Sequence, residues 1–87
     1  MAKEILVLGG AGLMGSNLCC LLAEKGYSVA AIDKNPHNLK VLKQACNKVN
    51  TICLDITNKK AIEPYVKNAD VVVQLQSQIM ATSKEKY

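Results

Sequence analysis

The chain has 87 residues with a formal net charge of +4, and 49% of its residues are hydrophobic. This length allows one domain with a modest core, and because Trp and Phe are absent, that core must be aliphatic. The lysines are scattered and no aromatic residues are interleaved with them, which argues against a nucleic-acid partner, and no run approaches the ~18 apolar residues of a membrane span.

Four short apolar runs alternate with three longer segments of helical period, which is typical of βαβ units around a parallel sheet. The runs cover residues 3–8, 28–33, 50–54 and 70–75. They are continuous in aliphatic residues, as expected for strands covered on both faces. The first run is short and meets glycine, which favours a strand over a signal peptide.

The first expected helix covers residues 12–25 and ends before Gly26, a residue suited to the left-handed position after a helix. Its apolar residues are spaced so that they form one face toward the core. These residues are Met14, Leu18, Leu21 and Leu22.

The second expected helix opens with Asn35 as its N-cap and Pro36 in its first turn, and it ends near Asn47. Its core face is formed by Leu39, Leu42 and Cys46. The third begins at Thr57 or Asn58 and closes at Asn68. We expect it to be short or broken, because Pro64 lies inside it and an interior proline costs about 3 kcal/mol.

Right-handed crossovers predict a three-layer α/β fold of Rossmann type, with strand order 3-2-1-4. The first two helices then cover one face of the sheet and the third helix covers the other. The order in which strands are added to the sheet reverses between strands one and four, and ligands of such sheets bind at that point. We interpret residues 1–87 as one domain, the first part of a larger Rossmann fold.

The four cysteines, Cys19, Cys20, Cys46 and Cys53, form no C-x-x-C pair, and His37 is the only histidine. A zinc site would need a better ligand set than this. We expect no metal site and buried free thiols, which are typical of a reducing cytoplasm.

A glycine-rich turn follows the first strand and opens the first helix. Gly10, Gly12 and Gly15 satisfy G-x-G-x-x-G, and Gly9 provides the alternative G-x-x-G-x-x-G. Glycine lets a pyrophosphate approach the backbone N–H groups at the helix N-terminus. Gly9 or Gly10 would allow the tight turn, Gly12 the close approach, and Gly15 the packing of helix on strand.

Two aspartates follow later strands. Asp33 lies about 20 residues beyond the glycines, where a carboxylate binds the adenosine ribose hydroxyls and favours NAD over NADP, although Lys34 would partly offset the repulsion of a 2′-phosphate. Asp33 is also a common residue before a turn. Asp55 follows the third strand and is placed either to bind the adenine amino group or to cap the next helix.

The run from Ile5 to Leu18 resembles the N-terminal motif of the extended short-chain dehydrogenases, the NAD-dependent epimerase/dehydratase family, of which a typical version reads TGGAGFIGSNL. The resemblance continues through Asp33, residues 54–57 and residues 69–75. It departs after the fourth strand, where residues 74–77 replace the His-Leu-Ala-Ala that is common in the family. The cofactor neighbours it implies are Gly9, Gly12, Leu13, Met14, Asp33, Asp55, Ile56, Leu75 and Gln76.

The resemblance implies the NAD-binding part of a cytoplasmic, homo-oligomeric enzyme that acts on a nucleotide sugar. The family's catalytic tyrosine and lysine, in Y-x-x-x-K, have no counterpart here, since Lys84 lies on the wrong side of Tyr87. We therefore expect no catalytic residue in this chain and no turnover by it alone. Two alternatives share parts of the pattern. One is a saccharopine-dehydrogenase-like oxidoreductase. The other is a nucleotide sensor of the potassium-transport type, whose second strand commonly reads I-D-K-N-P, as residues 32–36 do here.

Overall fold

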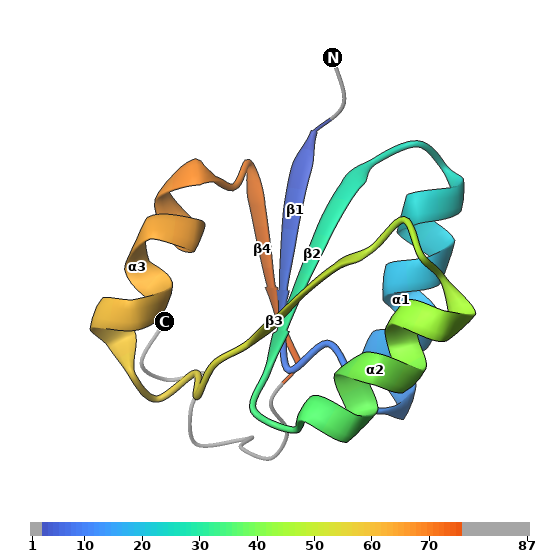
Figure 1. The fold of residues 1–87 in the computed structure, drawn as a ribbon. Coiled ribbons are helices and arrows are strands. Elements are labelled where there is room, and N and C mark those ends of the chain that lie inside the picture. The colour runs from blue at the N-terminus through green and yellow to red at the C-terminus, as the bar shows by residue number, and fades with distance from the viewer. Residues whose placement is uncertain (1–2, 76–87) are drawn as a thin grey trace.

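The computed structural model describes residues 3–75 and arranges them in three layers (Figure 1). The elements in chain order are β1 (Glu4–Leu8), α1 (Leu13–Glu24), β2 (Ser28–Asp33), α2 (Pro36–Ala45), β3 (Asn50–Cys53), α3 (Lys59–Asn68) and β4 (Val71–Gln74). Each expected element is present, with ends that differ by one or two residues. All pairings are parallel and the strand order is β3-β2-β1-β4, which confirms the predicted topology.

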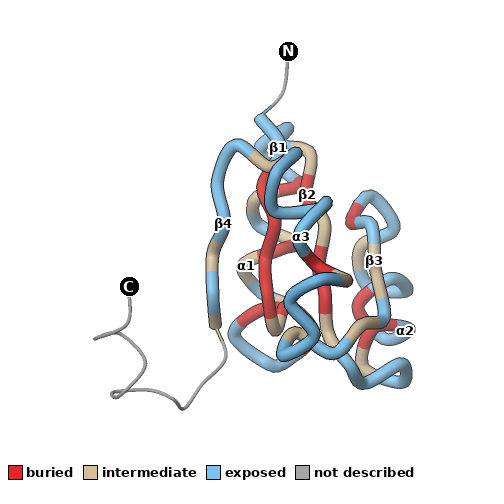
Figure 2. Tube along the Cα trace, turned by 90° about the vertical axis from the view of Figure 1, so that its left-hand side faces the viewer, coloured by how far each residue is buried: buried red, intermediate tan, exposed pale blue. Residues whose placement is uncertain are grey.

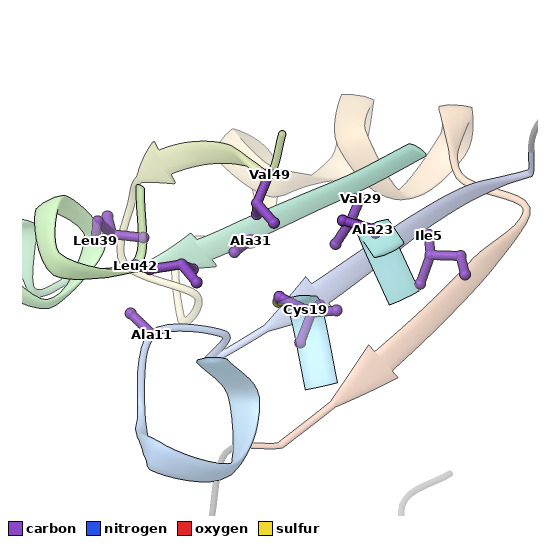
Figure 3. Close-up of a cluster of buried hydrophobic side chains, with 10 residues drawn as sticks. Ile5, Ala11, Cys19, Ala23, Val29, Ala31, Leu39, Leu42 and Val49 are labelled. Atoms are coloured by element: carbon purple, nitrogen blue, oxygen red, sulfur yellow. The ribbon is translucent and has the colours of Figure 1, made fainter. Parts of the chain in front are cut away.

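Alternate residues of β1 face opposite layers of the molecule. Ile5 and Val7 join the core beneath α1 and α2, whereas Leu6 and Leu8 join a smaller core beneath α3. Figure 2 shows the buried centre of the sheet, and Figure 3 shows the larger core. The continuous apolar run of β1 therefore reflects burial on both faces, as predicted.

The outer strands depart from that expectation. β4 lies at the edge of the sheet, and Val71 and Val72 are 39% and 41% exposed. Cys53, in the other outer strand, is exposed, so the expectation that the thiols are buried was wrong for this one. Cys19 is fully buried, and burial, together with the nearby Cys20 and Cys46, raises its pKa to about 11.

The predicted core face of α1 was wrong for Met14 and Leu21, whereas Leu22 is half-buried and packs against the larger core. Met14 and Leu21 are 74% and 50% exposed, while the residues that meet the sheet are small: Gly15, Cys19 and Ala23. These three are spaced at i, i+4 and i+8, so they form one narrow stripe. Because they are small, the helix axis lies close to the sheet, and the large side chains are left at the flanks of the contact.

The expectation of a short or broken third helix was also wrong, since α3 continues through Pro64 for ten residues. Asn58 caps its first turn by accepting a hydrogen bond from the backbone N–H of Ala61 at 3.3 Å. Pro64 removes the donor for the carbonyl of Lys60. Both residues are exposed, so water can solvate that carbonyl and the helix need not break.

Within residues 3–75, no helix has the length and apolar character needed to cross a bilayer. The same part of the chain contains no group of three or more His, Cys, Asp or Glu side chains arranged to hold a metal ion.

Candidate functional site

A hollow of about 250 Å³ lies at the carboxyl ends of the strands. Its lining comes from the segments at or after the ends of all four strands: Gly9, Gly12, Asp33, Lys34, Asp55, Ile56, Thr57 and Leu75. This position includes the point between β1 and β4 where the strand order reverses, which is where open α/β sheets bind ligands.

The glycines of the first turn have different roles. Gly9 adopts a φ of +79°, which favours glycine, and its N–H donates to the carbonyl of Ile32 at 2.7 Å. A Cβ on Gly10 would lie 2.8 Å from the Cβ of Ala31, and a Cβ on Gly15 would lie 2.8 Å from the backbone of Gly10. The turn, the strand and α1 therefore pack at distances that exclude side chains.

Gly12 differs from Gly10 and Gly15 because a Cβ built on it would meet no atom within 4 Å. Its φ of −74° is open to any residue. Neither packing nor backbone conformation requires glycine here, so Gly12 leaves free space that lies directly on the hollow.

The N-terminus of α1 begins at this open space. Gly12 is its N-cap, no side chain caps the first turn, and that turn has no acidic residue. The first N–H groups of a helix lack partners within the helix and carry the positive end of its dipole. This end of α1 is suited to binding an anion such as a phosphate.

The carboxylate of Asp33 joins the glycine turn to the start of α2. One oxygen accepts a hydrogen bond from the N–H of Ala11 at 3.2 Å, and the other accepts one from the N–H of Asn35 at 3.0 Å. A carboxylate oxygen has capacity for a further hydrogen bond. The side chain is thus fixed at the hollow while it keeps acceptor capacity for a ligand.

Asp55 is held by a single neighbour. Its Oδ1 accepts hydrogen bonds from the Thr57 hydroxyl at 2.7 Å and the Thr57 N–H at 2.9 Å. These bonds, with a smaller contribution from the charge of Lys34, lower the pKa of Asp55 below its usual value. Asp55 does not cap α3, because Asn58 does so, and that alternative reading of Asp55 was wrong.

The hollow brings together seven of the predicted site residues: Gly9, Gly12, Asp33, Lys34, Asp55, Ile56 and Leu75. Leu13 and Met14 do not line it and are 83% and 74% exposed, and Gly15 is buried behind the turn. Gln76 lies outside the described residues. Thr57 was missed, although the Asp-x-Thr spacing of a local side-chain turn was a signal for it.

A parallel sheet with this order and a glycine turn that opens a helix define a Rossmann-type NAD-binding fold. The model of the NAD dependent epimerase/dehydratase family matches residues 5–87. The chain therefore belongs to that family, as its resemblance implied, and the match favours this family over the two alternatives weighed from the sequence.

The relatives are much longer than this chain. A 3-beta-hydroxysteroid dehydrogenase from Mycolicibacterium neoaurum is 35% identical over 69 residues, which are 79% of this chain and 18% of that protein. The PbgP3 protein from Burkholderia pseudomallei is 31% identical, with a TM-score of 0.73 over 86% of this chain and 25% of its own. The epimerase Mth375 from Methanothermobacter thermautotrophicus is 27% identical, with a TM-score of 0.73 over 88% of this chain and 23% of its own.

Proposed function

We propose that this chain holds the adenosine and pyrophosphate of NAD in the hollow at the carboxyl ends of its strands. The observation that carries the proposal is the free space at Gly12, which lies beside the uncapped start of α1. A volume of about 250 Å³ is below the range of about 300–1,000 Å³ for sites that enclose a whole small molecule. It suits the adenosine half of the dinucleotide.

In this proposal the pyrophosphate, the ribose and the adenine are bound by different parts of the hollow. The N–H groups that follow Gly12 donate to the pyrophosphate, and Asp33 accepts from the two ribose hydroxyls. Asp55 accepts from the adenine amino group, while Ile56 and Leu75 supply apolar contacts. Bound NAD would supply a hydride acceptor to the whole enzyme.

The same residues favour NAD over NADP. A 2′-phosphate at the ribose would bring negative charge against the Asp33 carboxylate, which is already fixed by two backbone donors. Lys34 lines the hollow and offsets part of this repulsion. We therefore expect weaker binding of NADP, without complete exclusion.

For the whole protein we propose epimerisation, dehydration or reduction of a nucleotide sugar, in a homo-oligomer in the cytoplasm. The family match and the likeness to the epimerase Mth375 support this class. A second candidate is oxidation of a 3β-hydroxysteroid, which the 35% identity to a dehydrogenase of that name favours. Assays of the whole protein with UDP-sugars and with 3β-hydroxysteroids, each with NAD, would separate the two.

The binding proposal is tested by calorimetric titration of the 87-residue chain with NAD and ADP-ribose. Gly12→Val should reduce affinity for both at least tenfold, because the branched side chain occupies the space meant for the pyrophosphate. Far-UV circular dichroism should show that the fold persists, since a Cβ at this position meets no atom within 4 Å and the position opens onto the hollow.

A matched control is Asn17→Val, which places the same side chain on an exposed position of α1. It should leave both affinities unchanged. Equal affinities of wild type and Gly12→Val would show that the turn does not hold phosphate and would overturn the proposal.

A further inference from the structure

We propose that Thr57 is a positioning residue that makes this site selective for adenine over bases that lack an amino group at the same position. It acts by holding one oxygen of Asp55 so that the other is presented to the base. The inference rests on the proposed binding of a dinucleotide in this hollow.

Both bonds from Thr57 reach the same oxygen of Asp55. The hydroxyl donates to Oδ1 at 2.7 Å and the backbone N–H donates to Oδ1 at 2.9 Å. Oδ2 accepts no hydrogen bond from the residues that the structure describes. Because Thr57 and Asp55 both line the hollow, Oδ2 is the oxygen left for a ligand.

Asp55 needs such a restraint because it is exposed. An exposed carboxylate samples several rotamers, and fixing it during binding costs side-chain entropy. The main chain after Asp55 is itself tied back, since the N–H of Asn58 donates to the carbonyl of Asp55 at 2.9 Å. Thr57 therefore fixes the side chain before a ligand arrives, which is preorganisation.

A fixed, ionised carboxylate distinguishes bases by hydrogen-bond polarity. It accepts hydrogen bonds and donates none. Adenine has an exocyclic amino group that donates, whereas hypoxanthine has a carbonyl oxygen at the same position, which repels the carboxylate. The low pKa of Asp55 keeps the group ionised across the neutral range, so the mismatch is not relieved by a proton.

The test compares the affinities of the chain for NAD and for nicotinamide hypoxanthine dinucleotide, measured by calorimetry at neutral pH. The wild type should prefer NAD about tenfold or more, which corresponds to the loss of one charge-assisted hydrogen bond. Thr57→Val preserves shape and removes the hydroxyl, and it should lower this preference to about threefold or less. Thr57→Ser restores the hydroxyl and should restore the preference.

The ratio of affinities separates this role from a structural one, because a general loss of structure would weaken both dinucleotides together. Thr57 is exposed, so we expect both variants to fold, and circular dichroism checks this. A tenfold preference that persists in Thr57→Val would overturn the inference while leaving the proposed function intact. A wild type that binds neither dinucleotide would overturn the proposed function, and this inference with it.

Discussion

Two residues of the same type, Asp33 and Asp55, are held in place in different ways. Both residues line the hollow. Asp33 is held by two backbone donors from different segments, the glycine turn and the start of α2. Asp55 is held by the side chain and backbone of one neighbour, Thr57. The position of Asp33 therefore depends on the tertiary fold, whereas that of Asp55 depends mainly on a three-residue turn.

This difference predicts a pH effect at Asp55. NMR titration of its carboxyl carbon should give a midpoint below the usual range for aspartate, because the Thr57 hydroxyl and N–H stabilise the charged form. Thr57→Val should raise the midpoint, and Thr57→Ser should leave it low. A depressed folded-state pKa stabilises the fold above the unfolded-state pKa, and that contribution is lost as the pH falls through the folded-state value. An unshifted midpoint in the wild type would contradict these bonds.

At the scale of elements, the position of α1 is decided by small residues. The stripe of Gly15, Cys19 and Ala23 meets the sheet, and the buried thiol of Cys19 donates weakly to the carbonyl of Gly10 at 3.9 Å. Close approach of α1 also brings its N-terminus to the glycine turn. The geometry of the candidate site, at the N-terminus of α1, thus depends on the small size of Cys19 and Ala23 further along the same helix.

We therefore expect Ala23→Leu to lower the free energy of unfolding by about 1–3 kcal/mol, the usual cost of overfilling a packed core. Leu21→Ala, on the exposed side of the same helix, should change it by less than about 1 kcal/mol. Urea denaturation followed by circular dichroism measures both. A larger effect at Leu21 than at Ala23 would show that the large residues, and not the small stripe, face the sheet.

At the scale of the whole molecule, β4 is an outer strand of the sheet that residues 3–75 form. β4 pairs with β1 from Ile5↔Val71 to Leu8↔Gln74, and no described residue pairs with its outer side. Val71 and Val72 are exposed, and Val73 is half-buried against the larger core. All three are β-branched, and the strand contains no charge that would oppose pairing with another chain. The chain spans only about a quarter of the length of the solved relatives to which it is similar.

We predict concentration-dependent association of the 87-residue chain through β4. Val72→Lys should suppress it, because a buried lysine would oppose strand pairing between copies. Val41→Lys, at an exposed valine of α2, is the matched control and should leave association unchanged. Sedimentation velocity over a range of concentrations measures the effect, and a wild type that stays monomeric throughout would contradict the prediction.

The sequence determined those features that depend on local geometry. Alternation of apolar runs and helical segments indicated the parallel order of the strands, because right-handed crossovers leave few alternatives. Asn35 was identified as a cap, and the structure confirms that its side chain accepts from the N–H of Asn38 at 3.1 Å. Asp33 and Asp55 were each identified as a candidate cofactor-binding residue, because each lies at or after the carboxyl end of a strand, where ligands of such sheets bind.

Tertiary structure decided the features that depend on how closely the helices, strands and turns of the fold approach one another. Periodicity could not choose between the large and the small face of α1, since both repeat with helical spacing and only contact with the sheet selects the small one. The exposure of Cys53 and Val72 was not predicted, because continuous apolar runs indicated strands covered on both faces. The predicted strand order had placed both residues in outer strands, and the extent to which helices cover those strands is decided by tertiary packing. The free space at Gly12 is likewise a property of the fold, because Gly10 and Gly15 belong to the same motif yet are closely packed.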